Sequence, residues 1–352
     1  MGCSRSSGSS AGRISVDFNN SLAPLAKVVK SVEFIPLEND DDHLLGSTVG
    51  LDVVADSYIV TDYLNGSIFR YSLDGRFLNS VGRRGNGPEE YVHINDVQVC
   101  GADLYVFSAP SKVQRFSLEG ELLDTRTSGD LGSMSWITDD GVLTYYGYGS
   151  GRESRFSLLS GNARTDYYPS SEKVMNYTPT EQIFSESGDS VFVVDSYSDI
   201  VKVYTGRKMQ DGPSFDFGKY SIPQSFYEYD DAFSAMDSIL GGEFAMLGRY
   251  VCDGVRRLVT IHLQDQTGVM TNYCGLFLDG RWNWFLAGKE GSDALSKAFQ
   301  TLKDGVLYCL LDPALMSTFP SSLKSLAMNP EALESTSDGD NYILAKITLK
   351  FN

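Results

Sequence analysis

One unit of sequence recurs along the chain. The segment "YIVTDYLNGSIFRYSLDGRFLNSVG", from Tyr58, aligns with "LYVFSAPSKVQRFSLEGELLDTRTSG", from Leu104. Each copy reads as two strands joined by a short turn, with an acidic-Gly turn leading to a third strand. A third copy starts at Val191, and weaker copies cover 136–168, 256–277 and the split pair 296–312 with 341–351.

A repeat of roughly 40 to 50 residues with four short antiparallel strands is the signature of a β-propeller blade. A single four-stranded sheet cannot bury both of its faces, whereas blades packed around an axis bury them against one another. We therefore predict an all-β fold, a six-bladed β-propeller of four-stranded antiparallel blades over residues 31–352. Residues 1–30 would form a flexible tether and lead-in.

The last copy is one strand short. The segment "KSVEFIPLE", Lys30 to Glu38, precedes the first blade without a partner of its own. We predict that it pairs with the C-terminal "ILAKITLKF" and closes the ring.

Charge and composition exclude several classes of function. The chain has 29 basic and 46 acidic residues, for a net charge of −17, which disfavours binding to nucleic acid or anionic lipid. No apolar run approaches the ~18 residues of a membrane span. With three histidines and no closely spaced cysteine pair, a zinc centre is not expected, and we predict a monomer without a cofactor.

The N-terminal "MGCSRSSGSSAG" combines an early cysteine with a stretch that has nothing to bury. It is similar to the mature start of a bacterial lipoprotein, with Cys3 as the lipidated residue. Met-Gly-x-x-x-Ser also fits myristoylation of Gly2, and a plain disordered tail is a third interpretation.

"VEFIPLE", "HLLGSTVGL" and "IFRYSLDGRFLNSVGRRGNGPEEY" together resemble the bacterial six-bladed β-propeller lipoproteins that are distantly related to NHL-repeat proteins. The junction Gly82–Tyr91 carries that family's Gly-x-x-Gly-x-Gly-Pro-x-Glu-Tyr pattern. The resemblance implies a lipid-anchored, extracytoplasmic protein of Gram-negative bacteria, in the periplasm or at the outer membrane.

The glycine-rich stretch Gly82–Tyr91 invites comparison with a phosphate-binding loop. It lacks the lysine and hydroxyl of a P-loop, and a strand rather than a helix follows it, so we interpret it as a junction between blades. Arg83 and Arg84 could hold a carboxylate or sulfate, but an ion pair with Glu89 or Glu90 inside the loop is the favoured interpretation.

Alternating strands place the turns between second and third strands, and the links between blades, on one face of a propeller. The short turns 73–75, 118–120 and 264–268 are assigned to the other face. Function concentrates in long loops on a rigid scaffold, so the face with the long segments 82–91, 162–180, 219–242, 278–291 and 313–340 is the candidate binding surface. We expect helical turns near 219–242 and around Leu323–Leu333.

Aromatic and charged side chains of these segments suit a glycan or a peptide, because rings stack and polar groups fix orientation. Each ring could instead pack beneath its own loop. The candidate ligand-binding residues are Arg83, Arg84, Glu89, Glu90, Tyr91, Phe226, Tyr227, Tyr229, Arg281, Trp282 and Trp284.

Acidic residues recur at equivalent blade positions. Asp62, Asp195 and Asp312 follow the second strand of their blades, where an Asx turn is favoured over a Ca²⁺ site. Nearer the axis, Asp52, Asn95 and Asp96 are the candidate metal ligands. We therefore expect a non-enzymatic binding or scaffold propeller for a glycan, peptide or envelope protein. The alternative is a Ca²⁺-dependent, lactonase-like hydrolase with its site in the channel.

Overall fold

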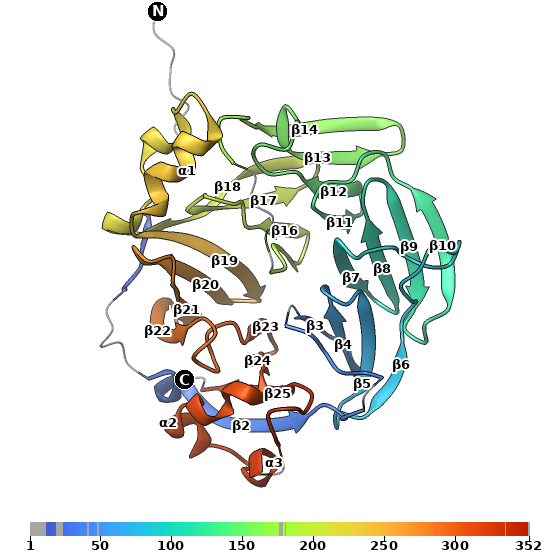
Figure 1. The fold of residues 1–352 in the computed structure, drawn as a ribbon, viewed down its shortest axis with the longest axis vertical. Helices are drawn as coiled ribbons and strands as arrows, with labels where there is room; N and C mark the ends of the chain where they lie inside the picture. The colour runs from blue at the N-terminus through green and yellow to red at the C-terminus, as the bar shows by residue number, and fades with distance from the viewer. Residues whose placement is uncertain are drawn as a thin grey trace, which may run out of the picture.

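Six β-sheets surround a central axis in the computed structural model of the protein, which describes residues 12–18, 24–40, 42–47, 49–175, 179, 181–334 and 336–350. Figure 1 looks down this axis and shows the chain passing from blade to blade around the ring. The predicted six-bladed β-propeller of four-stranded antiparallel blades is confirmed.

The first three blades follow one another along the chain, each running from an inner to an outer strand. Their strands are β3 (Val49–Val53), β4 (Ser57–Asp62), β5 (Ser67–Ser72) and β6 (Phe77–Ser80); β7 (Asp96–Cys100), β8 (Asp103–Ser108), β9 (Lys112–Ser117) and β10 (Leu122–Thr127); and β11 (Met134–Thr138), β12 (Gly141–Tyr145), β13 (Ser154–Ser160) and β14 (Ala163–Pro169).

The other three blades repeat the scheme, and the sixth takes its outer strand from the N-terminal part of the chain. Their strands are β15 (Phe184–Ser187), β16 (Ser190–Val193), β17 (Ile200–Thr205) and β18 (Lys208–Asp216); β19 (Phe244–Asp253), β20 (Arg256–Gln264), β21 (Met270–Leu278) and β22 (Arg281–Lys289); and β23 (Phe299–Lys303), β24 (Val306–Leu311), β25 (Ile343–Leu349) and β2 (Val29–Pro36).

The ring closes as the sequence predicts. Strand β2 pairs antiparallel with β25, from Val29 opposite Leu349 to Pro36 opposite Ile343. On its outer side, the side-chain amide of Asn329 bonds both the N–H and the carbonyl of Phe34, at 3.0 and 2.7 Å. Pairing of the two ends of the chain in one sheet closes the ring and makes β2 the outer edge strand of blade 6.

The segment before β2 lies against the ring within its described part. β1 (Ile14–Ser15) adds a parallel fifth strand to β18 of blade 4. The ring of Phe18 then meets Tyr273 of blade 5 edge-on, with centroids 5.2 Å apart. Contacts with the ring thus occur within the segment predicted as tether and lead-in, while Cys3 lies outside the described residues.

Inter-blade packing forms the core. Blades 5 and 6 share one cluster of buried side chains, and blades 3, 4 and 5 share another, which includes the fully buried Phe156, Phe215 and Tyr273. Alternating strand residues supply these clusters, because successive side chains point to opposite faces of a sheet.

All long connections lie on one face, as predicted; we call it the long-loop face. It carries the links between blades and the turns between second and third strands. Three assignments need correction. The turn predicted at 264–268 spans 265–269, joins β20 to β21 and so belongs to this face. The segment 278–291 is mostly strand β22, preceded by the turn Asp279–Gly280 on the opposite face, and residues 163–169 of the segment 162–180 form β14.

Short helices lie within the connections of the long-loop face. The link 217–243 holds η2 (Gly218–Tyr220), η3 (Gln224–Tyr227) and α1 (Ala232–Leu240), which confirms the helix expected there. In the connection 312–342, the helical pattern forms α2 (Ser321–Lys324) and α3 (Glu331–Glu334), two separate turns rather than one helix, after η4 (Pro313–Thr318). A further turn, η1 (Leu25–Val28), precedes β2. No helix within the described residues is long and apolar enough to cross a membrane.

Candidate functional site

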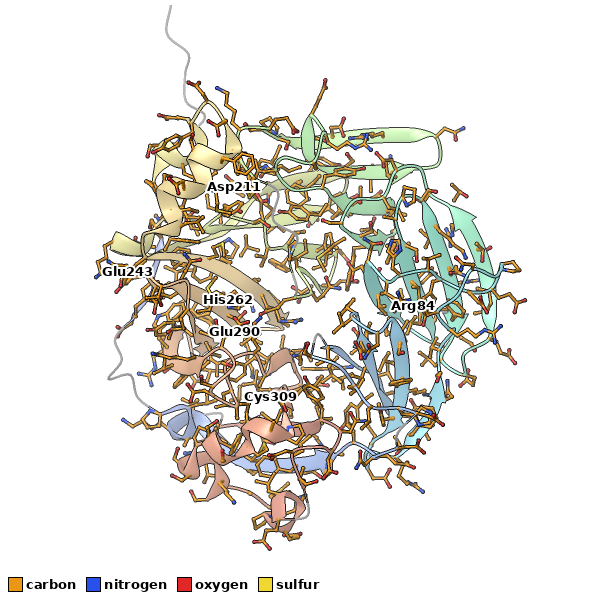
Figure 2. The ribbon with its side chains drawn as sticks, in the orientation of Figure 1. Arg84, Asp211, Glu243, His262, Glu290 and Cys309 are labelled. Atoms are coloured by element: carbon orange, nitrogen blue, oxygen red, sulfur yellow. The ribbon has the colours of Figure 1, made fainter. Side chains whose placement is uncertain are left out.

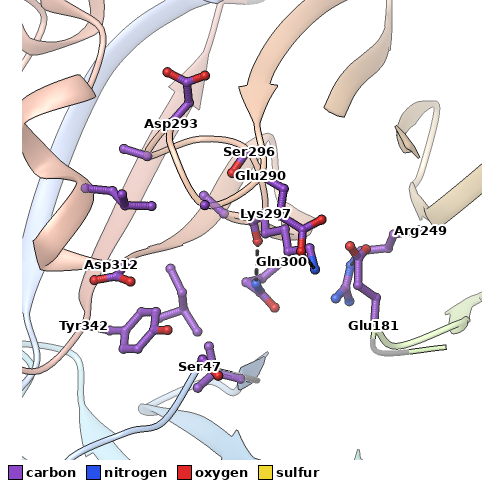
Figure 3. Close-up of a pocket in the computed structure, with 16 residues that line it drawn as sticks. Ser47, Glu181, Arg249, Glu290, Asp293, Ser296, Lys297, Gln300, Asp312 and Tyr342 are labelled. Atoms are coloured by element: carbon purple, nitrogen blue, oxygen red, sulfur yellow. Dashed lines mark hydrogen bonds and ion pairs between the residues drawn. The ribbon is translucent and has the colours of Figure 1, made fainter. Parts of the chain in front are cut away.

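Two cavities follow the axis of the ring and meet at two side chains. The upper chamber opens on the long-loop face with a volume of about 370 Å³, and the lower chamber, of about 330 Å³, opens on the opposite face. Arg249 of β19 and Gln300 of β23 line both chambers, and we call this pair the neck. Figure 3 shows the upper chamber, whose polar lining is Ser47, Glu181, Arg249, Glu290, Asp293, Ser296, Lys297, Gln300, Asp312 and Tyr342.

The neck is polar, buried and incompletely bonded. Arg249 is 6% exposed and Gln300 is 4% exposed. Within the described part of the chain, neither Nε of Arg249 nor Oε1 of Gln300 has a hydrogen-bond partner. Because buried polar atoms are almost always paired, these two atoms single out the neck as the candidate binding site.

A charged cluster supports one side of the neck. The carboxylate of Glu181 lies 3.1 Å from Nε2 of His262 and 3.9 Å from Nε of Arg249. Although burial acts in the opposite direction, His262 and Arg249 lower the pKa of Glu181 to about 2. Burial lowers the pKa of His262, but the Glu181 carboxylate outweighs it and raises that pKa above its usual value. Figure 2 shows His262 and Glu290 on the blade 5 side of the ring.

A bulge in β19 and the glycine next to Arg249 shape this part of the site. The pairing of β19 with β20 shifts register between Leu247 and Arg249, a bulge that re-aims the side chain. Between them stands Gly248, where an added Cβ would lie 2.2 Å from Nε2 of His262. Only glycine leaves room for the histidine there.

Two of the three candidate metal ligands approach the lower chamber. Burial raises the pKa of Asp96 to about 8 and that of Asp52 to about 6. Both carboxyls also contribute to raising the pKa of Tyr63, for which burial is the main cause. The channel therefore brings Asp52, Tyr63 and Asp96 into one electrostatic neighbourhood.

The residues present do not fit a calcium site. Asp96 accepts hydrogen bonds from the backbone N–H groups of Val97 and Ser135 and from Gln182, at 2.8, 3.2 and 2.6 Å. Asn95 turns away, and its Oδ1 accepts from Ala109 N–H at 2.7 Å. Across the described ranges, no group of three or more histidine, cysteine or acidic side chains converges as a metal site.

The junction Gly82–Tyr91 is held by its own side chains. Arg83 and Glu90 form an ion pair at 2.5 Å, the internal pairing favoured from the sequence. Arg84 donates to the carbonyl of Val92 at 3.2 Å, and Glu89 is exposed. The ring of Tyr91 is 1% exposed against the core, so in this conformation it offers no surface to a ligand.

The aromatic candidates divide between the link 217–243 and an outer strand. Phe226 is fully buried, while Tyr227 and Tyr229 pack beside it and are partly exposed. Trp282 and Trp284, expected in a loop, lie on β22 and stack at 5.5 Å, and Trp282 meets Phe215 of blade 4 at 5.6 Å.

Arg281 is exposed and begins β22 directly after the Asp279–Gly280 turn, on the face opposite the long loops. The segment "RWNWF" alternates aromatic and polar residues, a pattern typical of a strand. The candidate residues are thus spread over both faces and do not converge on one site.

The repeated aspartates serve the blades in different ways. Asp62 accepts from the N–H of Asn65 at 3.0 Å, and Asp312 caps η4 through the N–H of Ala314 at 2.9 Å. Asp195 departs from the expected Asx turn and pairs with the buried Arg155 of blade 3 instead.

None of the residues of the neck and its supporting cluster was among the sequence candidates. Arg249, Gln300, Glu181 and His262 come from two inner strands, one link between blades and the second strand of blade 5. A usable signal existed: Arg249 interrupts the apolar run "FAMLGRYV", and Gln300 interrupts "KAFQTL". In both cases, a polar residue inside the apolar run of an inner strand lies at the channel.

Comparison with known proteins places the chain among propellers. A family described as "Domain of unknown function (DUF4934)" matches residues 13–269. Among solved structures, a candidate exported protein of Bacteroides fragilis is similar at 16% identity with a TM-score of 0.78, covering 96% of this chain and 100% of that one.

A member of the DUF4221 family from Bacteroides vulgatus is similar at 9% identity with a TM-score of 0.54, covering 92% of this chain and 97% of that one. Both likenesses establish the fold alone. No curated protein matches the chain.

Proposed function

The chain belongs to the DUF4934 family, and from this premise we propose that it is a non-enzymatic binding protein that works outside the cytoplasm. Its ligand, part of a glycan, a peptide or an envelope protein, enters from the long-loop face. The observation that carries this proposal is the upper chamber, which opens among the long connections and ends on the incompletely bonded neck. Concave sites with few convergent polar groups are where small ligands bind.

The extracytoplasmic location rests on separate support. The similar protein of Bacteroides fragilis is described as a candidate exported protein, and the N-terminal sequence resembles that of lipoproteins. We propose that lipid attached to Cys3 anchors the propeller to a membrane of the cell envelope and that the propeller acts as a monomer. Mass spectrometry of the N-terminal peptide, with a Cys3→Ala variant as control, tests the anchor.

The binding proposal is tested by closing the chamber. Ser47 lines its mouth and is exposed, so Ser47→Trp fills the entrance without disturbing the core. Val255→Trp is the matched control, because Val255 is 79% exposed in the turn between β19 and β20 on the opposite face.

Glycan and peptide arrays identify ligands of the wild-type protein. We expect Ser47→Trp to lose them and Val255→Trp to retain them. The reverse result, or an unchanged array for both variants, would show that the chamber does not receive the ligand.

A further inference from the structure

We infer that the upper chamber is a site for a zwitterionic ligand of the amino-acid or short-peptide class, with its carboxylate bound by Arg249. This inference rests on the proposed function and names the chemistry of its ligand.

The guanidinium of Arg249 is the first argument. It is 6% exposed, and its nearest carboxylate oxygen, on Glu181, stands 3.9 Å from Nε, beyond hydrogen-bond distance. Its Nε has no hydrogen-bond partner within the described residues. An arginine buried in this way is costly unless an anion completes its bonding. The planar fork of a guanidinium matches a carboxylate through two parallel hydrogen bonds.

Gln300 supplies the second argument. It is 4% exposed, and its Nε2 donates weakly to the carbonyl of Lys297 at 3.4 Å, which leaves Oε1 as an acceptor without a donor. A ligand that fits the neck must therefore bring an N–H or O–H close to its carboxylate. A simple inorganic anion would satisfy Arg249 and leave this oxygen unpaired.

The charge of the chamber supplies the third argument. Its lining holds four acidic and two basic side chains, and one basic residue, Lys297, is paired with Glu290 at 2.6 Å. Figure 3 shows Asp293 and Asp312 away from the side of the chamber that carries Arg249. Glu181 lies on the same side as Arg249, 3.9 Å from its Nε. The excess of acidic side chains therefore favours a ligand that carries an ammonium group as well as the carboxylate that Arg249 binds.

Size sets the limit on the ligand. A volume of about 370 Å³ lies at the lower end of the range for small-molecule pockets, about 300–1,000 Å³. The chamber holds an amino acid or a dipeptide, and a longer peptide would extend onto the long-loop face.

The test uses L-alanyl-L-alanine as the probe. Its binding to the full chain is measured by calorimetry and by the shift in thermal unfolding. L-alanyl-L-alanine amide removes the carboxylate, N-acetyl-L-alanyl-L-alanine removes the ammonium, and galactose is a neutral polyol. Arg249→Met keeps the length of the side chain without its charge. Arg126→Met is the matched control, because Arg126 lies half exposed on the outer strand of blade 2, where it pairs with Asp124 at 3.4 Å.

We expect the dipeptide to bind with a stoichiometry of one, and both modified dipeptides to bind at least tenfold more weakly. Arg249→Met should weaken binding of the dipeptide at least tenfold, and it should also lower the unfolding temperature, because it removes the cation beside the buried Glu181 carboxylate. Arg126→Met should bind as the wild type does. A folded Arg249→Met that binds the dipeptide as tightly as the wild type would overturn the inference.

Two results separate this inference from the proposed function. Arg249-dependent binding of galactose without binding of the dipeptide would overturn the zwitterionic class and leave a binding propeller. Equal binding of the dipeptide and its amide would overturn the role of Arg249, whatever the ligand is. Absence of dipeptide binding at millimolar concentration overturns the inference, while the Ser47→Trp arrays decide the proposed function independently.

Discussion

The buried carboxyl of Asp96 should make the propeller lose stability as pH rises. Asp96 has no exposed surface, and burial raises its pKa from 3.8 to about 8 against the opposing hydrogen bond from Gln182. In the unfolded chain the same group ionises near its ordinary value. Between these two pKa values the folded state therefore holds one proton more than the unfolded state.

The sign and size of the effect follow from proton linkage. Where the folded state binds the extra proton, the free energy of unfolding falls by about 1.4 kcal/mol for each pH unit. The contribution of Asp96 is greatest below its unfolded pKa and is lost as pH rises toward its folded pKa. From pH 5 to pH 8 the loss is about 4 kcal/mol, a large part of the 5–15 kcal/mol that stabilise a typical domain.

Asp96→Asn isolates this contribution. In the variant, the amide oxygen can still accept from Val97 N–H and from Gln182. In the wild type, the other carboxyl oxygen accepts from Ser135 N–H at 3.2 Å, and in the variant an amide nitrogen takes the place of that oxygen. Two donors that face each other leave one buried group unsatisfied, at a cost of about 1–3 kcal/mol. The variant should therefore be less stable than the wild type at pH 5 and more stable at pH 8.

Urea unfolding followed by tryptophan fluorescence, at pH 5, 6, 7 and 8 and constant ionic strength, measures both proteins. Asp52 and His262 also have raised pKa values, the first by burial and the second by Glu181 against burial. Because both groups are present in both proteins, the difference between wild type and variant reports Asp96. A difference that stays constant across this range would refute the reasoning, because it would mean that Asp96 does not titrate there.

Three further changes test the ring and its channel. Phe34→Ala in the closing strand, 1% exposed and packed edge-on against a ring of the long connection, should cost about 3–5 kcal/mol in urea unfolding. Asp195→Asn leaves Arg155 buried without its carboxylate and should cost about 3–5 kcal/mol by the same assay. Glu181→Gln removes the carboxylate that outweighs burial at His262, so the pKa of His262 should fall in a titration followed by NMR, where three histidines give separable signals.

Each of these changes has a control in the same chain. Leu123→Ala, 45% exposed on β10, should stay within about 0.5 kcal/mol of the wild type. Asp124→Asn breaks an exposed pair with Arg126 and should cost less than about 1 kcal/mol. The signal of the exposed His93 should be unaffected by Glu181→Gln. Equal costs for Phe34→Ala and Leu123→Ala would mean that closure does not depend on packing of β2.

The architecture was predictable because it is written in short-range patterns. Each blade is specified locally by alternation within its strands and by glycine turns. The motif "RYSLDG" around Tyr71 recurs as "RFSLEG" around Phe116. Closure was predictable for a related reason: an unpaired strand, Lys30–Glu38, and a blade that lacks one strand satisfy each other. The strand of Trp282 and Trp284 was misplaced, because its β-rich "RWNWF" follows a turn that was assigned to the wrong connection.

The site was not predictable from the same patterns, because it is made by side chains that meet only when the ring is closed. Aromatic residues in the long connections were predicted to bind the ligand, yet Tyr91 and Phe226 are buried beneath their own connections. Arg249 and Gln300 each occupy an ordinary position in an inner strand, and their relation depends on the bulge in β19 and on the placing of blade 6 beside blade 5.

A propeller interior also explains why polar residues of this kind persist. Blade packing alone does not require a polar residue on an inner strand, since each blade buries its faces against neighbouring blades rather than across the axis. An arginine on such a strand gains nothing from blade packing and loses hydration, so its presence is a cost to folding. That cost is consistent with a bound partner at the neck. If Arg249→Met proved both less stable and no weaker in binding, the arginine would instead belong to the scaffold, and the chamber would be a gap between blades rather than a site.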